Sequence, residues 1–168
     1  DHRHRDLPLQ RGPVVPAHGG GSCHNGAGAR PRARSIRPVR DRGWTEADVP
    51  SLEGRVFLVT GANGGLGYET ARVLAQRGAR VTLACRRPDA AAEAARRIRD
   101  LAPGARVQVE ALDLADLGSV AECASRVGEA LGRLDGLVNN AGLMGVPRAL
   151  TADGIERQFT VNHLGHFA

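Results

Sequence analysis

The sequence lacks lysine altogether, and all 23 of its basic residues are arginine. Tyrosine, tryptophan and methionine occur once each, and no apolar run is long enough to cross a bilayer, so a membrane span is not expected. The three cysteines, Cys23, Cys85 and Cys123, have neither the spacing of a disulfide framework nor that of a metal site. We therefore expect no bound metal, and we expect reduced thiols in a cytoplasmic protein.

Acidic residues are scarce only in the first quarter of the chain. The formal net charge is +5, and residues 1–43 hold nine arginines against three aspartates, so the remainder is close to neutral. This segment is rich in arginine, glycine and proline, shows no apolar periodicity and is predicted to be a disordered tail. The alternatives are an organellar transit peptide, a segment that is not natural coding sequence and a nucleic-acid-binding arm, and we do not expect nucleic-acid binding. Residues 44–168 are predicted to form one folded domain.

The most informative feature that is present is an apolar stretch followed by a glycine-rich turn. Residues 56–59 form an unbroken apolar run, typical of a strand buried on both faces, and a helix pattern begins at Leu66. Glycines in the turn let backbone N–H groups approach an anion, and the start of the helix adds further free donors. The pattern predicts a phosphate-binding loop made of Thr60, Gly61, Asn63, Gly65, Leu66 and Gly67.

From residue 55 onward, strand and helix patterns alternate, which is typical of a parallel sheet covered by helices. Strands are predicted at 55–60, 80–84, 106–112 and 134–138, and helices at 66–77, 89–101, 116–131 and from 151 onward. Right-handed crossovers then give an α/β fold of the Rossmann type, a doubly wound parallel sheet with strand order 3-2-1-4. We expect Asp89 to cap the second helix, and we expect the first to face the sheet with Leu66, Thr70, Val73 and Leu74.

Ligands of such a sheet lie beyond the carboxyl ends of its strands. Arg86 and Arg87 follow the second predicted strand, where a protein that binds NAD would place a carboxylate against the ribose 2′-hydroxyl. A guanidinium group instead pairs with a 2′-phosphate. The sequence therefore predicts NADP in preference to NAD, with Arg86 at the 2′-phosphate. A solvated pair of arginines at a helix start is the alternative.

Three segments together resemble the short-chain dehydrogenase/reductase family, and in particular its retinol-dehydrogenase-like members. They are the Thr-Gly-xxx-Gly-x-Gly pattern of residues 60–67, the Asn-Asn-Ala-Gly sequence of residues 139–142, and residues 153–167. The resemblance covers residues 44–168. It implies an NAD(P)-dependent oxidoreductase that moves a hydride between NADP(H) and a carbonyl or alcohol substrate, and a full-length protein that forms a homo-oligomer.

The resemblance also implies roles for individual residues. Asp113 and Leu114 would contact the adenine, although a turn or a helix cap is an alternative role for Asp113. Asn162 would belong to the catalytic tetrad and would kink its helix so that a backbone carbonyl holds a water. The spacing of His163 and His166, one helical turn apart, is a separate matter: they could bind a metal, but we expect a packing role because no carboxylate or cysteine has a suitable spacing. The central strands would be braced, and the cofactor cleft lined, by Asn139, Asn140, Ala141 and Gly142.

The other catalytic residues of this family are a serine, and a tyrosine followed four positions later by a lysine. This chain has no lysine, and its single tyrosine, Tyr68, lies beside the glycine-rich turn. We therefore expect an amino-terminal fragment that lacks the later strands and has no turnover on its own. A non-catalytic dinucleotide sensor that binds a partner protein is the alternative function. The substrate stays open, although the resemblance of residues 153–167 favours a hydrophobic alcohol or aldehyde.

Overall fold

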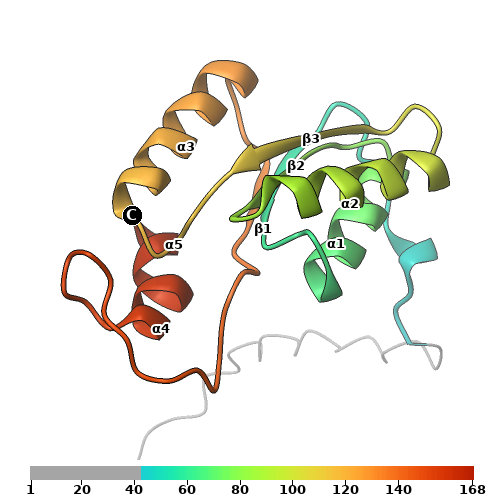
Figure 1. Cartoon of the computed structure of the whole chain (residues 1–168). Helices are drawn as coiled ribbons and strands as arrows, with labels where there is room; N and C mark the ends of the chain where they lie inside the picture. Colours follow the sequence, from blue (N-terminus) through green and yellow to red (C-terminus); the bar gives the residue numbers. More distant parts are fainter. Residues whose placement is uncertain (1–42) are drawn as a thin grey trace, which may run out of the picture. The chain divides into compact units, whose positions relative to one another are not determined.

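Four parallel strands form the sheet of the computed structural model, which describes residues 43–168. The strands are β1 (Val56–Thr60), β2 (Arg80–Cys85), β3 (Arg106–Ala111) and β4 (Gly136–Val138). Their order, β3-β2-β1-β4, confirms the predicted Rossmann-type α/β fold (Figure 1). β1 and β2 are central because their apolar and β-branched residues suit burial on both faces, and Val59, Val81 and Leu83 are fully buried there.

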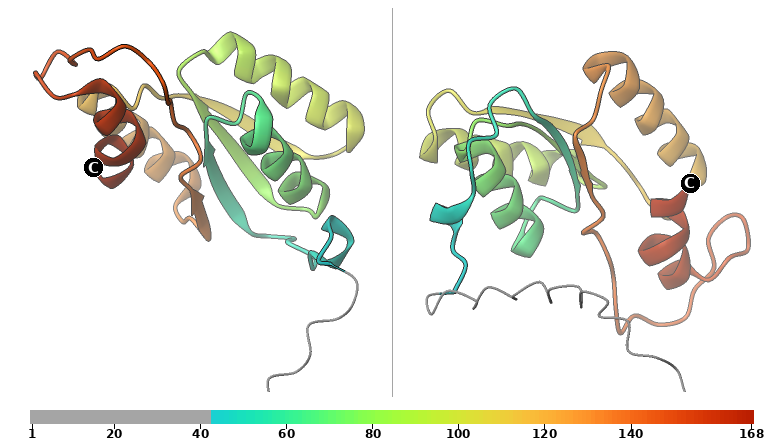
Figure 2. Two further views of the ribbon diagram at one scale, coloured as in Figure 1. Left: turned by 90° about the horizontal axis from the view of Figure 1, so that it is seen from below. Right: turned by 180° about the vertical axis from the view of Figure 1, so that it is seen from behind.

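Helices cover both faces of this sheet (Figures 1 and 2). α1 (Gly65–Gln76) and α2 (Pro88–Leu101) pack on one face, and α3 (Leu117–Leu131) packs on the other together with the helical segment at the carboxyl end. Right-handed crossovers explain the division, because the chain moves from β1 out to β3 and then crosses back to β4 over the opposite face. A single 3₁₀ turn, η1 (Glu46–Asp48), precedes β1.

Leu74 packs against the core, as predicted, but the rest of the predicted inner face of α1 was wrong. Leu66 is 82% exposed, and Thr70, Val73 and Leu74 are only half-buried. The residues that α1 buries are small, apart from one tyrosine: Gly67, Tyr68, Ala71 and Ala75. Small side chains let the helix axis approach the sheet closely, so burial here follows size and not hydrophobicity.

The predicted cap of α2 was also wrong. The helix begins at Pro88, with Arg87 as its N-cap residue, and Asp89 lies inside the first turn. Proline is favoured at the first helical position because its missing N–H would have no partner there. Asp89 still stabilises the helix start, since a carboxylate in the first turn faces the positive end of the helix dipole.

The last helical segment begins at residue 157 and not at residue 151. Residues 151–154 form a turn, Thr151 N–H donates to the Ile155 carbonyl at 2.8 Å, and Gly154 adopts a φ of +75° that a helix does not allow. Glu156 then caps the helix by accepting from the N–H groups of Gln158 and Phe159. The segment consists of α4 (Arg157–Phe159), a π-helical turn η2 (Thr160–Leu164) and α5 (Gly165–Phe167).

A groove of about 470 Å³ opens on the face of the sheet that carries α3 and α5. Its walls are mostly apolar, and Leu137 and Phe167 at its rim are 52% and 83% exposed. Among the described residues, no strand pairs with the outer edge of β4. This face of the sheet is therefore incompletely covered by residues 43–168.

The tail predicted at residues 1–43 lies outside the described residues, apart from Gly43, and stays a prediction. In residues 43–168 no helix combines the length and the apolar character that a bilayer crossing requires.

Candidate functional site

The loop after β1 leaves backbone donors free at the start of α1. Gly64, the N-cap residue, has an extended backbone and no side chain that could accept from the helix, so the first N–H groups of α1 have no side-chain cap. Gly61 N–H donates to the Ala84 carbonyl at 2.9 Å, which anchors the loop to β2. An uncapped helix start beside the carboxyl edge of a parallel sheet is a place where an anion can bind.

Gly67 brings this helix start close to the loop after β4. A Cβ atom at Gly67 would lie 2.7 Å from the Gly61 carbonyl oxygen and closer still to Nδ2 of Asn140. Only a residue without a side chain fits there, because both neighbours are held in place by hydrogen bonds. The glycine therefore sets the close approach of the two loops.

The loop after β4, residues 139–142, is fixed to the end of β1 by Thr60 and Asn140. The Thr60 hydroxyl oxygen accepts from the backbone N–H groups of Asn140 at 3.0 Å and Ala141 at 2.9 Å. In return, Asn140 Nδ2 donates to the Thr60 carbonyl at 2.8 Å. Thr60 is buried, so these bonds are shielded from water and hold the loop across the end of β1.

A cleft of about 180 Å³ lies between the ends of the four strands. It collects residues from the loop after each strand, as expected for a ligand site at the carboxyl edge of such a sheet. Seven of the predicted cofactor residues line it: Gly61, Asn63, Arg86, Asp113, Leu114, Ala141 and Gly142.

The other predicted residues do not line this cleft. Gly65 and Gly67 lie in the first turn of α1, and Leu66 extends into solvent beside them. Asn140 lies behind the cleft, where it holds Thr60. Asn139 instead lines the apolar groove on the α3 face of the sheet, because successive residues leaving a strand point in opposite directions.

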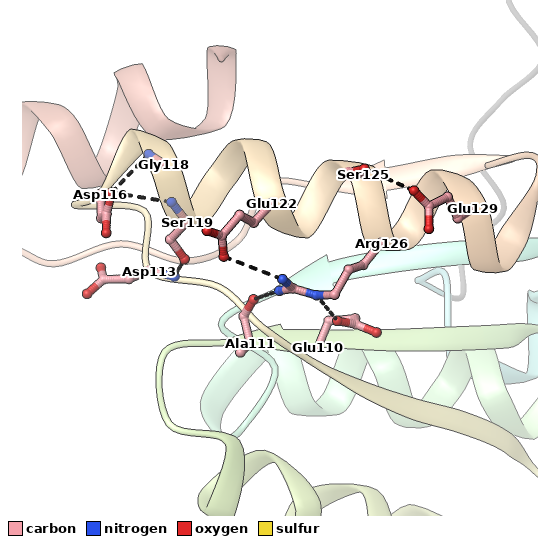
Figure 3. Close-up of polar contacts among 10 residues, drawn as sticks. All are labelled: Glu110, Ala111, Asp113, Asp116, Gly118, Ser119, Glu122, Ser125, Arg126 and Glu129. Atoms are coloured by element: carbon pink, nitrogen blue, oxygen red, sulfur yellow. Dashed lines mark hydrogen bonds and ion pairs between the residues drawn. The ribbon is translucent and has the colours of Figure 1, made fainter.

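Asp113 occupies the segment between β3 and α3 (Figure 3). Its Oδ1 accepts from Ala115 N–H at 2.9 Å, and its own N–H donates to the Ser119 hydroxyl at 3.0 Å. One carboxylate oxygen thus stabilises the turn, as the alternative interpretation expected. The residue also lines the cleft, so both of its suggested roles are compatible with this position.

Two further side chains, those of Asp116 and Arg126, hold this segment against α3. Asp116 caps α3 by accepting from the N–H groups of Gly118 and Ser119. The Arg126 guanidinium, drawn between three partners in Figure 3, donates to Glu110 at 3.2 Å and to the Ala111 carbonyl at 3.1 Å, and lies 3.6 Å from Glu122. These contacts fix the end of β3, and with it the position of Asp113 at the cleft.

Asn162 lies in the π-helical turn η2 and clasps the end of the loop after β4. Its Oδ1 accepts from Leu143 N–H at 2.8 Å, and its Nδ2 donates to the Leu143 carbonyl at 2.7 Å. Both halves of the amide are therefore used on a single residue. A π turn inside a helix is rare and is found frequently at functional sites, and here it coincides with the residue predicted to be catalytic.

The sequence interpretation missed five residues that line the cleft: Ala84, Cys85, Leu112, Leu143 and Val161. Cys85 is the last residue of β2. Burial raises the pKa of its thiol, and the backbone N–H groups of Ala62, Asn63 and Gly61 oppose this shift, which places the thiol beside the glycine loop. The position of Cys85 at the end of a strand was the signal that could have identified it.

The two histidines of the last helix have separate surroundings. The His163 ring lies 5.3 Å from the Phe159 ring, whereas His166 Nε2 lies 2.9 Å from the Thr60 hydroxyl. Residues 43–168 contain no cluster of three or more histidine, cysteine or carboxylate side chains that could hold a metal ion.

Comparison with known proteins matches residues 55–168 to the model of a family described as short chain dehydrogenase. Mouse retinol dehydrogenase 11 is 48% identical over 132 residues, which are 79% of this chain and 42% of that protein. Human retinol dehydrogenase 13 is 46% identical over 117 residues, 70% of this chain and 35% of that protein. The chain thus spans less than half the length of these relatives.

Solved structures are also similar to this chain over only part of their length. A crystal structure of a protein from Mycobacterium paratuberculosis is 48% identical, with a TM-score of 0.65 over 75% of this chain and 44% of that one. A metagenomic short-chain oxidoreductase, crystallised in complex with NADP, is 36% identical, with a TM-score of 0.60 over 70% of this chain and 53% of that one.

Proposed function

Because the chain belongs to the short-chain dehydrogenase family, we propose that its sheet edge binds NADP, and that the whole protein transfers a hydride between NADP(H) and an alcohol or carbonyl group. The observation that carries the proposal is the cleft into which the loops after all four strands converge. The members of the family are NAD(P)-dependent oxidoreductases. What we propose beyond the family is the preference for NADP over NAD and the class of substrate.

The residues around the cleft fit a dinucleotide. The uncapped start of α1 suits a pyrophosphate, since backbone N–H groups can approach it closely. Leu114 and Asp113 also line the cleft, where an apolar side chain and a carboxylate suit an adenine and its amino group. When bound, NADP supplies the nicotinamide carbon that accepts or donates the hydride.

Arg86 supports the choice of NADP over NAD. It lines the cleft at the end of β2 and is exposed, and no carboxylate among the described residues pairs with it. A free guanidinium forms charge-assisted hydrogen bonds with a phosphate, whereas its hydrogen bond with an uncharged ribose hydroxyl is weaker. The NADP complex of the metagenomic relative is consistent with this choice.

We also propose that the substrate is a hydrophobic alcohol or aldehyde, on the basis of the retinol dehydrogenases among the relatives. The chain contains no lysine, a residue that the reaction of its relatives is expected to need. The activity is therefore proposed for the whole protein, and we expect no turnover from these 168 residues. A homo-oligomeric whole protein and a cytoplasmic location stay predictions.

The exchange of Arg86 for glutamate tests the cofactor proposal. Dissociation constants for NADP and NAD would be measured by calorimetry for the unchanged chain and for Arg86→Glu. We expect the affinity for NADP to fall by about 10- to 100-fold, the range for a lost hydrogen bond to a charged group, while the affinity for NAD changes little.

Arg87→Glu is the matched control, because Arg87 is the exposed neighbour of Arg86 and does not line the cleft. It should alter the affinity for NADP only slightly. An unchanged preference between NADP and NAD in Arg86→Glu, or no binding of NADP by the unchanged chain, would contradict the proposal.

A further inference from the structure

The side chain of His166 connects the last helix to the buried end of β1. Its Nε2 lies 2.9 Å from the Thr60 hydroxyl oxygen, across 106 residues of sequence. The same hydroxyl oxygen accepts from the N–H groups of Asn140 and Ala141, which begin the loop at the cofactor cleft. His166 therefore contacts the hydroxyl oxygen that accepts both of these backbone N–H groups.

A count of lone pairs at Thr60 decides which group donates. A hydroxyl oxygen has two lone pairs, and the N–H groups of Asn140 and Ala141 occupy both. The hydroxyl proton must then find an acceptor, which is either His166 Nε2 at 2.9 Å or the Val138 carbonyl at 3.4 Å. The shorter contact assigns Nε2 as the acceptor, so the imidazole is neutral and carries its proton on Nδ1.

The surroundings of the ring favour this neutral form. Burial lowers the pKa of His166, and only the backbone carbonyl of Asn162 opposes that shift. Neither β1 nor β4 brings a charged side chain to the groove that the ring lines. From α3 and the turn after it, the groove receives the Cys123 thiol and the Arg133 guanidinium, and a cation there cannot stabilise a second positive charge.

We propose that neutral His166 is a positioning residue, which fixes the rotation of the Thr60 hydroxyl and thereby holds the backbone of Asn140 and Ala141 at the cofactor cleft. Protonation of the ring would direct a third donor at an oxygen whose lone pairs are already used. The last helix would then lose this hydrogen bond to β1, and the loop would be held less firmly. The inference rests on the proposed function only for its effect on NADP.

Two measurements on the 168-residue chain test the proposal by NMR. The ¹⁵N shifts of the His166 ring report its tautomer, and we expect Nε2 to be unprotonated at pH 8. In His166→Phe, which keeps a ring but removes the acceptor, the amide proton of Ala141 should exchange about fivefold faster than in the unchanged chain, as expected when a hydrogen bond worth about 1 kcal/mol is lost. The Asn140 amide, which also donates to the Val138 carbonyl at 3.0 Å, should change less. Protonated Nε2 at pH 8 overturns the proposal even if the variant fails to fold.

A pH series of NADP affinity provides the functional readout. Because burial lowers the pKa of His166 below its ordinary value of 6.5, the ring is neutral and its contact with Thr60 is intact at and above that value, and the contact is lost only as the pH falls through the lowered pKa. Between pH 8 and 5 the affinity should therefore fall by about three- to tenfold more in the unchanged chain than in His166→Phe. The 2′-phosphate titrates in the same range, so the difference between the two profiles is the quantity to compare.

His163→Phe is the matched control, since it removes an exposed histidine one turn earlier in the same helix. It should keep the amide exchange rates and the pH profile of the unchanged chain, and His166→Gln, which restores an acceptor oxygen, should recover part of the protection. Equal exchange rates and equal pH profiles in His166→Phe and the unchanged chain overturn the proposal. If the exchange rates change but NADP does not bind at all, the positioning role stands and the proposed function fails.

Discussion

The two faces of the sheet are covered to different degrees. On the face of α1 and α2, fourteen buried residues form one continuous core, rich in alanine, around β1, β2 and β3. On the face of α3 and α5, the core has only seven buried residues and leaves the groove of about 470 Å³ open beside β4. The face of α1 and α2 is therefore fully covered, whereas the face of α3 and α5 is partly exposed.

The difference follows from the size of the side chains that face the sheet. Ala71, Ala75, Ala91, Ala94 and Ala95 let α1 and α2 lie close to the strands, so little space is left between them. On the other face, the larger residues of the groove wall have no opposing layer among the described residues, and Leu137 remains half exposed. Close packing should therefore make mutations costly on the first face and mild on the second.

Truncation of one core residue on each face should show this difference most strongly. Ile98 is fully buried beneath α2, and Ile98→Ala should lower the free energy of unfolding by about 3 kcal/mol, because a closed core cannot relax into the cavity. Val127→Ala, at the groove, should cost about 1 kcal/mol, since its site already opens to solvent. Denaturant unfolding measures both, and equal losses would show that the two faces are packed equally well.

An added methyl group at Gly67 should have the next largest effect. Gly67→Ala places a Cβ against Asn140 and the Gly61 carbonyl, so the two loops must separate, at a cost of about 1–2 kcal/mol in stability. NADP affinity should fall with it, because the loops border the cleft. Gly64→Ala is the control, as no atom lies within 4 Å of its Cβ position and its backbone is extended. If thermal melting and calorimetry give the same values for both variants, the loops are not in tight contact.

The smallest effect is expected at the attachment of β4 to β1. The Asp135 carboxylate accepts from Arg55 at 2.8 Å and from Val56 N–H at 2.9 Å, and these bonds lower the pKa of Asp135, with the Arg55 hydrogen bond as the largest cause. A carboxyl whose folded pKa is lowered stabilises the fold fully above its ordinary pKa of 3.8, and this contribution is lost as the pH falls below that value.

Asp135→Asn should therefore melt at a slightly lower temperature than the unchanged chain at pH 7, and the two melting temperatures should converge towards pH 2. Asp153→Asn, at an exposed turn, serves as the control and should follow the unchanged chain throughout. A constant difference between Asp135→Asn and the unchanged chain from pH 7 to pH 2 would exclude the charged carboxylate as the cause.

Strand positions and sheet order could be predicted because they depend on local patterns. Apolar runs bounded by glycine or proline mark the strands, and right-handed crossovers leave few possible orders. The inner face of α1 could not be predicted in this way. A hydrophobic pattern selects Leu66 and Val73 as the buried residues, whereas close packing selects alanine and glycine. The start of the last helix was placed six residues early because the turn at Thr151 ends in a backbone conformation that only the structure shows.

The site was predictable to the extent that it is made by strand ends. Gly61, Arg86, Asp113 and Ala141 each follow a strand, and the sheet brings them together. The direction in which each side chain leaves its strand could not be predicted in the same way. Asn139 follows β4 but points into the groove and not into the cleft. The connection between His166 and Thr60 has no local signal, since it depends on the packing of a distant helix.

The position of β1 in the middle of the sheet also bears on how the chain reaches its fold. β1 pairs with β2 over a separation of 24 residues, at Val56 and Arg80, but with β4 over 79 residues, at Phe57 and Gly136. Closing the longer loop costs more chain entropy, so we expect β1, β2 and β3 to assemble first and β4 to dock late. Pulse-labelled hydrogen exchange during refolding would then protect Val81 and Leu83 before the amides of β4, and the cofactor cleft would be the last part of the molecule to form.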